Sequence, residues 1–435
     1  MISNLNSINT SNIYGVKPAK AKASAGISAS YTNAPVARPS FTSYNPVNVV
    51  KTTLTAQSDI KKYTEISANL DAEGKKSLDY MLKTGTLLSN NSNDKSSTLD
   101  NLHKMVTNKR ANGLDAKIML NDTIKTIANP AIITQRFGNI PDNIKGTLKD
   151  YDPATKEVPN SGCCVAASIE FNLASQMPAE FARVAEGLSS EKMSSNKTID
   201  LKNLCENKDD AKWLLDNFKI PYQMKEGNKA EIVLAPDKNA IFRAHIQTVD
   251  RDAQERSPLD VLMQSTFMNV GSQQTYNTLN DVRVASFGPG DRGLVEIEKT
   301  FTESIVTDSN KTSVTFQDVQ EAQDANGAPV AKLVGYKADA NTIKRSLLYS
   351  LAQGQNVIIG YTATDDNNNI INGHEITVVG AKTTLDGKLV FVCNDTDDDS
   401  PELIEYHEDF LVPRIHHVGL PTEVVEADNN LKSIA

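Results

Sequence analysis

The chain has 435 residues, a length typical of two or three folded units rather than of one hydrophobic core. Hydrophobic residues make up 39% of it and charged residues 23%, and no apolar run is long enough to cross a bilayer. We therefore expect a soluble globular chain with no membrane contact. The net charge of -9 argues against a nucleic-acid partner, because binding phosphates needs clustered Lys and Arg.

Residues 1–56 are predicted to form a disordered basic leader. Residues 1–58 contain five cations and no Asp or Glu, so this stretch carries +5 and the rest of the chain, which totals -9, carries -14. The leader is rich in Ser, Asn, Thr, Ala and Pro and has no apolar period, so it cannot bury enough surface to offset the entropy of ordering. No apolar run follows Met1, which argues against a cleaved secretory signal. We expect a cytoplasmic protein by default, although an acid-poor leader is also found in uncleaved export signals.

Residues 57–135 have a helical apolar period and are predicted to form a small helical subdomain. The apolar positions are Leu78, Met81, Leu82 and Leu87, then Leu99, Leu102, Met105 and Val106. A third helix is expected over residues 114–128, and it should end at the Asn129-Pro130 step because the residue before proline is pushed out of the helical region. This subdomain would either cover the rest of the protein as a propeptide does, or serve packing and partner docking.

The middle of the chain is predicted to mix helices with short strands, such as residues 231–234 and 240–247. The single tryptophan, Trp213, stands at helical spacing among apolar residues and is expected in the core. Residues 302–330 are polar and are expected to be loop. The residues from 419 to 435 are expected to be a flexible tail.

Residues 339–394 show the clearest pattern. Asp339 is a typical helix cap and Gly354 a typical helix end, with apolar residues at helical spacing between them. Strands are then predicted over residues 357–361, 374–379 and 389–394. A histidine, His374, opens the second of these strands and an amide, Asn394, closes the third.

The four cysteines are predicted to be free thiols and not metal ligands. They are Cys163, Cys164, Cys205 and Cys393, which include no C-x-x-C pair, so neither disulfides nor structural zinc are expected. The acidic run 394–402 fails the calcium-loop pattern, because Ser400 stands at the glycine position and Tyr406 at the closing glutamate position. We expect no metal site and no cofactor.

Cys164 follows a turn and begins a helix whose apolar face is Val165, Ile169 and Leu173. A helix N-terminus and a neighbouring imidazolium both favour the thiolate, which is the reactive form of cysteine. Of the six histidines, only His374 lies at the start of an apolar strand that is followed by an amide at the next strand end. These residue types form a nucleophile, its base and a group that orients the base.

At these positions the sequence resembles the papain-like superfamily of cysteine peptidases, over roughly residues 155–418. The nucleophile motif of that family is Gly, small residue, Cys, bulky residue, Ala, any residue, Ser, and residues 162–168 read Gly-Cys-Cys-Val-Ala-Ala-Ser. Its base motif is matched by residues 373–380, which read Gly-His-Glu-Ile-Thr-Val-Val-Gly. The resemblance implies an α+β fold with an N-terminal helical lobe and an antiparallel sheet. It also implies a triad of Cys164, His374 and Asn394, or Asp395 in place of Asn394.

Two details of this site depend on chain geometry. If His374 lies opposite Asn394, the two side chains share a face of the sheet and residues 381–387 form a wide loop; a tight turn at Asp386 and Gly387 would instead pair Val379 with Asn394. We expect the wide loop, and therefore the asparagine.

The family usually places a glutamine just before the nucleophile to bind the oxyanion, and residues 150–163 contain none. Asn160 is one substitute. Gln135 is another, provided that residues 138–161 fold back and bring it beside the thiol. The backbone N–H of Cys164 is expected to be the other donor.

Three functions follow from the resemblance. The first is a cysteine peptidase that acts on a peptide or protein substrate through an acyl-enzyme. The second is an acyl or amide transferase of the transglutaminase type, in which an amine replaces water. The third is an inactive papain-like scaffold that acts as an interaction or effector protein.

Overall fold

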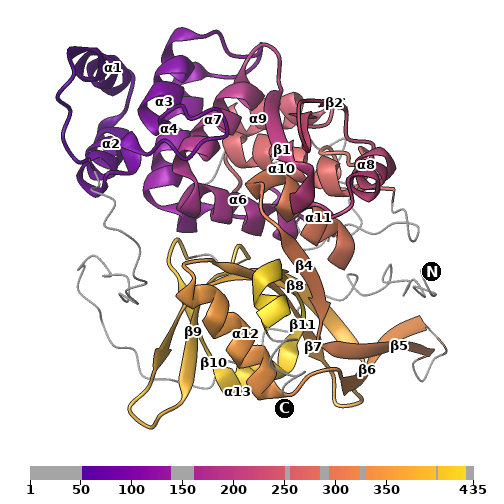
Figure 1. Cartoon of the computed structure of the whole chain (residues 1–435). Helices are drawn as coiled ribbons and strands as arrows, with labels where there is room; N and C mark the ends of the chain where they lie inside the picture. The colour runs from indigo at the N-terminus through magenta and orange to yellow at the C-terminus, as the bar shows by residue number, and fades with distance from the viewer. Residues whose placement is uncertain are drawn as a thin grey trace.

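The computed structural model describes residues 51–138, 161–249, 255–284, 293–323, 327, 329–397 and 400–427. Within them the chain is α+β and its strands pair antiparallel, as the sequence predicts. Most helices gather in one layer, and a large sheet lies against the lower side of that layer (Figure 1). In these ranges no helix combines the length and hydropathy that crossing a membrane requires. Most of the expected leader lies outside the described residues.

The first helices follow the predicted pattern. They are α1 (Gln57–Ala68), α2 (Ala72–Thr84), α3 (Thr98–Thr107) and α4 (Ala116–Ala128), with short 3-10 turns at Thr86–Leu88 and Pro130–Ile132. Asp71 caps α2, a Ser97–Asp100 capping box opens α3, and Asp115 caps α4. Helix α4 ends just before the Asn129-Pro130 step, as predicted.

These helices share one hydrophobic cluster with the helices that follow. The later members are α6 (Cys164–Gln176), α7 (Pro178–Ser189) and α10 (Pro258–Gly271). Leu102 and Met119 belong to the same cluster as Ile169 and Phe267. The packing therefore continues across the boundary expected near residue 135, and the four helices are part of the larger helical layer.

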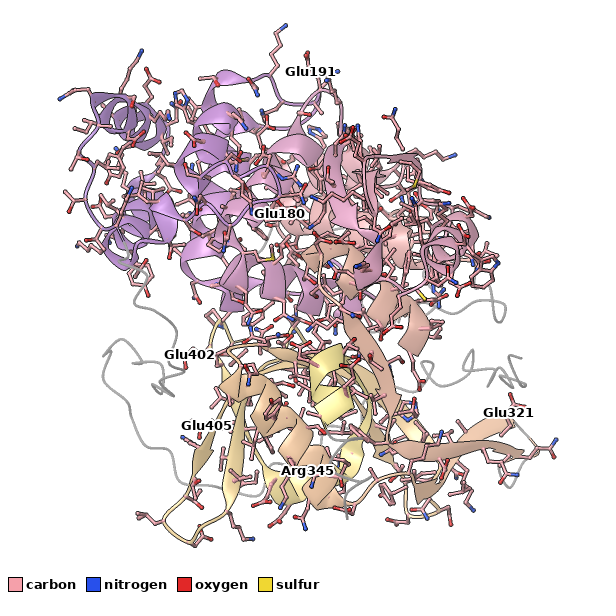
Figure 2. The ribbon with its side chains drawn as sticks, viewed as in Figure 1. Glu180, Glu191, Glu321, Arg345, Glu402 and Glu405 are labelled. Atoms are coloured by element: carbon pink, nitrogen blue, oxygen red, sulfur yellow. The ribbon has the colours of Figure 1, made fainter. Side chains whose placement is uncertain are left out.

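A buried carboxylate ties this layer to a small sheet. Glu180 of α7 is fully buried, and it pairs with Arg183 at 2.7 Å and with Lys197 at 3.1 Å. Figure 2 shows Glu180 inside the helical layer, whereas Glu402 and Glu405 lie at the outer side of the large sheet. The small sheet has the order β1-β3-β2, with β1 (Ser195–Asp200), β2 (Tyr222–Met224) and β3 (Lys229–Leu234).

The remaining helices of the layer are α8 (Lys208–Asn217), α9 (Ala240–Val249) and α11 (Glu296–Thr307). Residues 240–247 were expected to be a strand, and that prediction is wrong. Ala240, Arg243, Ala244 and Gln247 are buried at helical spacing. The prediction that Trp213 is core is also wrong, since its exposed fraction on α8 is 59%.

The large sheet has the strand order β10-β9-β8-β7-β11-β4 among the described residues. Its strands are β4 (Lys311–Thr315), β7 (Val357–Thr364), β8 (Ile370–Thr383), β9 (Leu389–Asn394), β10 (Ile404–His407) and β11 (Ile415–Pro421). Helix α12 (Ala340–Ala352) packs on it through Ile343 and Leu347, and Asp339 caps that helix as predicted. A separate hairpin, β5 (Gln317–Gln323) with β6 (Pro329–Tyr336), extends to one side (Figure 1).

Two expected boundaries are wrong at this end of the chain. Residues 302–330 were expected to be loop, but they contain the end of α11, all of β4 and β5, and the start of β6. Residues from 419 onward were expected to be a flexible tail, but β11 continues to Pro421 and the chain is helical from 422 to 427. Val424 in that turn is buried, so the folded body extends past residue 419.

Candidate active site

Cys164 is the first residue of α6. Its neighbour Cys163 is the N-cap and provides no side-chain cap, and the first helical hydrogen bond runs from the N–H of Ala167 to the carbonyl of Cys163 at 2.8 Å. The N–H groups of the first turn therefore have no partner within the helix, and together they make this end electropositive. The thiol lies at that end and is 8% exposed, which suits a group that must reach a substrate while most water is excluded.

His374 lies on β8, where α6 packs against the strand. The hydroxyl of Ser168 donates to the carbonyl of Glu375 at 3.4 Å, which joins the helix that Cys164 begins to the strand one residue from the histidine. His374 pairs with Tyr361 of β7, whose ring meets the imidazole edge-on with 5.7 Å between centroids. The histidine is thus held by a helix on one side and a neighbouring strand on the other.

The imidazole of His374 joins the thiol to a carboxylate. Its Nε2 lies 2.7 Å from Oδ1 of Asp395, and the ring also hydrogen-bonds to the side chain of Cys164. Burial lowers the pKa of His374, but the Asp395 charge, the hydrogen bond to Asp395 and the hydrogen bond to Cys164 together raise it well above its usual value. The raised pKa favours the imidazolium, the form that stabilises a thiolate beside it.

Asp395 directly follows β9 and is the hub of a small network. Its Oδ1 also accepts from the backbone N–H of Asp397 at 3.1 Å, and its Oδ2 accepts from the hydroxyl of Tyr406 at 2.9 Å. Burial raises the pKa of Asp395, but the His374 charge and these hydrogen bonds outweigh it and lower the pKa to about 2. The side chain is therefore a charged carboxylate throughout the physiological range.

Asn394 does not meet the histidine, and the expected hairpin register is wrong. Asn394 lies opposite Thr377, and a β-bulge follows between Val378 and Gly380. Since side chains alternate along a strand, Asn394 is on the sheet face opposite to His374. Asn394 is buried, and its side-chain oxygen has no hydrogen-bond partner in the described part of the chain. The turn is also tighter than expected, because the N–H of Thr384 already donates to the carbonyl of Lys388 at 2.8 Å.

Gln135 lies beside the nucleophile segment, although it precedes Cys164 by many residues in the sequence. Its carbonyl accepts from the N–H of Ser161 at 3.1 Å and from the Ser161 hydroxyl at 2.6 Å. Its own N–H donates to the carbonyl of Thr396 at 3.0 Å, next to Asp395. The backbone of Gln135 thus bridges the segments that carry the thiol and the carboxylate. Its side chain is buried and Oε1 has no partner among the described residues, whereas Asn160 lies outside them.

The segment that carries Gln135 is held by buried polar side chains. Gln264 donates to the carbonyl of Thr134 at 2.9 Å, and Arg243 donates to the carbonyl of Phe137 at 2.8 Å. The guanidinium of Arg243 also lies 4.4 Å from the centroid of the Phe137 ring. These contacts fix the backbone on both sides of Gln135.

Cys163 is unsuited to be the nucleophile. It is fully buried, its sulfur lies 3.0 Å from the hydroxyl of Tyr276, and that hydroxyl also hydrogen-bonds to Asp281. Burial and the neighbouring Asp281 charge raise the pKa of Cys163 to about 12. Burial likewise raises the pKa of Cys393. All four cysteines are free, and of the adjacent pair only Cys164 meets an imidazole.

The described residues contain no group of three or more His, Cys, Asp or Glu side chains arranged to hold a metal ion. His416 pairs with Glu296 at 2.5 Å, and His417 lies 2.7 Å from the hydroxyl of Ser313. Each of the two neighbouring histidines therefore already has a protein partner at one ring nitrogen.

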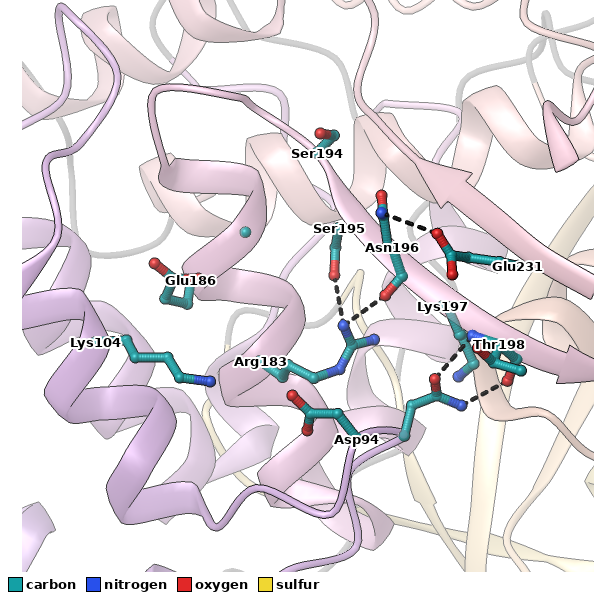
Figure 3. Close-up of a pocket in the computed structure, with 12 residues that line it drawn as sticks. Asp94, Lys104, Arg183, Glu186, Ser194, Ser195, Asn196, Lys197, Thr198 and Glu231 are labelled. Atoms are coloured by element: carbon teal, nitrogen blue, oxygen red, sulfur yellow. Dashed lines mark hydrogen bonds between the residues drawn. The ribbon is translucent and has the colours of Figure 1, made fainter. Parts of the chain in front are cut away.

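A pocket of about 370 Å³ lies between α3, α7 and β1, apart from the cysteine (Figure 3). Its lining includes Arg183, Lys104 and Asp94, and Figure 3 shows the Arg183 guanidinium pointing to Ser195 and Asn196. Arg183 donates to the carbonyl of Asn196 at 2.6 Å and pairs with Glu180, so its donors serve the protein itself. None of the residues around Cys164 lines this pocket.

Comparison of the chain with protein-family models, with curated proteins and with solved structures finds no match.

Proposed function

We propose that this chain is a cysteine peptidase of papain-like type that cleaves peptide bonds in a peptide or protein substrate. Cys164 is the nucleophile, His374 its general base and acid, and Asp395 the residue that orients the imidazole. One observation carries the proposal: the His374 ring bonds to Asp395 at 2.7 Å on one side and to the Cys164 side chain on the other. A thiol, an imidazole and a carboxylate joined by consecutive hydrogen bonds are the arrangement that activates a thiol.

The reaction follows from this arrangement. The Cys164 thiolate attacks the carbonyl carbon of the substrate, and His374 donates its proton to the leaving amine as the C–N bond breaks. The resulting thioester is attacked by water, whose proton passes to His374 as the C–S bond breaks and the carboxylic acid leaves. Asp395 keeps the imidazole in one orientation and balances its positive charge in both steps.

The oxyanion of each tetrahedral intermediate needs donors that are already in place. The backbone N–H of Cys164 is one, because it belongs to the first turn of α6, which lacks a side-chain cap. The side-chain amide of Gln135 is the other, which is supported by the backbone contacts that fix this residue against Ser161 and Thr396. Its buried Oε1 has no hydrogen-bond partner among the described residues, so no hydrogen bond to that oxygen ties the amide to the protein interior.

The fold supports the same proposal. The nucleophile begins a helix of the helical layer, and the base and the acid belong to the antiparallel sheet, so the site forms where the layers meet. This is the organisation that the resemblance to papain-like peptidases implies.

The test uses the full chain, Cys164→Ala and His374→Ala, with Cys205→Ala as a control for loss of a thiol elsewhere. Each protein is incubated with a complex peptide mixture, and new termini are identified by mass spectrometry. We expect cleavage by the wild type and by Cys205→Ala, and none by the other two variants. A parallel assay measures incorporation of a fluorescent primary amine into protein glutamines.

The two assays separate the candidate functions. Amine incorporation without cleavage would replace the peptidase by a transferase that forms the same thioester. If Cys164 reacts with iodoacetamide no faster than an ordinary thiol and neither product forms, the chain is an inactive scaffold and the proposal fails.

A further inference from the structure

The Asp395 carboxylate is held by a residue of strand β10, which is not part of any motif that predicted the site. Strand β10 pairs with β9, and Tyr406 lies opposite Phe391 in that pairing. The Tyr406 hydroxyl donates to Oδ2 of Asp395 at 2.9 Å, while Oδ1 serves His374 and the N–H of Asp397. Both carboxylate oxygens are therefore engaged, each on a different side.

The Tyr406 ring is itself fixed by a stack that leads to the surface. It lies on the ring of Phe410, with 5.6 Å between centroids and 13° between planes. The guanidinium of Arg414 lies 4.2 Å from the Phe410 centroid, and it donates to the Phe410 carbonyl at 2.7 Å. Phe410 belongs to a short helix, α13 (Glu408–Leu411), directly after β10. Stacking on Phe410 restrains the Tyr406 ring, and the hydrogen bond to Asp395 sets the direction of its hydroxyl.

We propose that Tyr406 is a positioning residue of the active site, whose hydroxyl keeps the Asp395 carboxylate in the orientation that His374 requires. This inference rests on the proposed function. The contacts of Asp395 to His374 and to Asp397 engage only one carboxylate oxygen, and a hydrogen bond to the second oxygen further restricts rotation about the Cβ–Cγ bond. The first oxygen then stays beside Nε2 of His374 while the thiol changes its charge.

The groups around this contact leave the hydroxyl as a donor. The titratable side chains that act on Asp395 or on Tyr406 are His374 of β8, Tyr361 of β7 and Cys393 of β9, and the backbone N–H of Asp397 donates to Asp395. Burial and the Asp395 charge raise the pKa of Tyr406, so its hydroxyl keeps its proton in any ordinary assay. In this hydrogen bond the Tyr406 hydroxyl is therefore always the donor and the Asp395 carboxylate the acceptor.

The experiment measures the rate of Cys164 alkylation by iodoacetamide from pH 4 to pH 10, which needs no substrate. Tyr406→Phe keeps the ring on Phe410 and removes only the hydroxyl, and Tyr80→Phe on the exposed face of α2 is the matched control. In the wild type we expect a reactive plateau between two steps, the lower for formation of the thiolate–imidazolium pair and the upper for loss of the imidazolium proton.

In Tyr406→Phe we expect the rate on the plateau to fall roughly tenfold, the usual effect of one hydrogen bond to a charged group. The lower step should move to higher pH and the upper step to lower pH, because a carboxylate that is less firmly oriented stabilises the ion pair less. Tyr80→Phe should match the wild type.

If folded Tyr406→Phe keeps both steps and a rate within twofold of the wild type, Tyr406 only packs and the inference fails. A different outcome is a wild-type alkylation rate with a single step near pH 8.5, which is about the pKa of an ordinary thiol. That result would overturn the proposed function, and with it this inference. The two failures are therefore distinguished by the wild-type curve alone.

Discussion

Asp395 combines two properties that an amide at the same place would not combine. It orients the His374 ring through one oxygen, as an amide oxygen would, and it also carries a charge that raises the pKa of that ring. The charge survives burial because His374, Asp397 and Tyr406 all donate to the carboxylate. The imidazolium of His374 should therefore persist to higher pH than it would beside an asparagine.

Substitution of Asp395 tests both properties. In Asp395→Ala, orientation and charge are lost, and we expect peptide cleavage to fall by roughly 10²-fold or more. In Asp395→Asn, the oxygen remains but the charge does not, so we expect a smaller loss. The pKa of His374 falls in this variant, and the alkaline limb of the pH–rate profile should move to lower pH. Rates between pH 5 and pH 10 measure both effects.

Asn394→Ala provides the comparison, because Asn394 is the adjacent residue and makes no hydrogen bond to His374 in the described part of the chain. A folded Asn394→Ala should keep its activity within a few-fold of the wild type. If it loses as much as Asp395→Ala, the assignment of the orienting residue to Asp395 is wrong.

At the scale of elements, α11 is bound to the sheet by buried ion pairs. Lys299 is fully buried and lies 2.6 Å from the carboxylate of Glu375 on β8, while Glu303 pairs with Lys311 of β4 at 3.0 Å. Glu303 and Lys311 are among the polar residues that led to the prediction of a loop over residues 302–330. A charged side chain can be buried where an opposite charge meets it, and only the packing decides which charges meet.

Removal of one partner of this buried ion pair should lower the free energy of unfolding. Glu375→Ala leaves Lys299 charged and buried without its carboxylate, and we expect the free energy of unfolding to fall by about 3 kcal/mol or more. Lys382→Ala is the control, because the Lys382–Glu405 pair is about half exposed and should contribute less than about 1 kcal/mol. Urea unfolding of both variants measures the difference. Equal losses would mean that the buried pair is no stronger than a surface pair.

Trp213 provides an optical test of the α8 surface. It is the single tryptophan of the chain, and its exposed fraction is 59%. We expect native fluorescence with a solvent-like emission maximum and quenching by acrylamide close to that of the unfolded chain. A blue-shifted emission that acrylamide does not quench would show that Trp213 is covered in solution. The expectation that it is core failed because helical spacing gives a period but does not say which side faces the protein.

For the whole molecule, the site exists only because distant segments meet. Cys164 comes from the helical layer, His374 and Asp395 come from the sheet, and the backbone of Gln135 joins the two through Ser161 and Thr396. Any change that separates the layers should therefore affect the site before it unfolds either layer.

Acid should destabilise the protein through two buried carboxylates. The pKa values of Asp395 and Glu180 are both about 2, well below those of the unfolded chain. Because these pKa values are lowered, their contribution is complete above the unfolded values near 4 and is lost as the pH falls through about 2. We expect each to contribute on the order of 2 kcal/mol.

Urea unfolding between pH 5 and pH 2 tests this expectation. The free energy of unfolding should decline steeply across this range in the wild type. The decline should be smaller in Asp395→Asn, which lacks one of the two groups. A flat profile in the wild type would contradict it. His374 acts in the opposite direction: its pKa is raised, so its contribution is complete below about pH 6.5 and is lost as the pH rises through the folded value.

The sequence by itself determined the elements whose signals are local. The capped helices, the step at Asn129, the helix after Asp339 and the strands on either side of His374 all follow from spacing, caps and turn residues within a few positions. The same local signals singled out Cys164 at a helix start and His374 in a strand, which the fold brings together. The α+β class was an implication of the resemblance to papain-like peptidases, and the structure is α+β.

Only the tertiary structure decided which residue orients the histidine. A one-residue bulge after Val378 sets the register of β8 with β9, and that register turns Asn394 away and leaves Asp395 beside His374. The place of Gln135 and the contact from Tyr406 likewise join residues far apart in the sequence. Register and long-range contact depend on how whole layers pack, and no pattern within a short stretch of sequence encodes that.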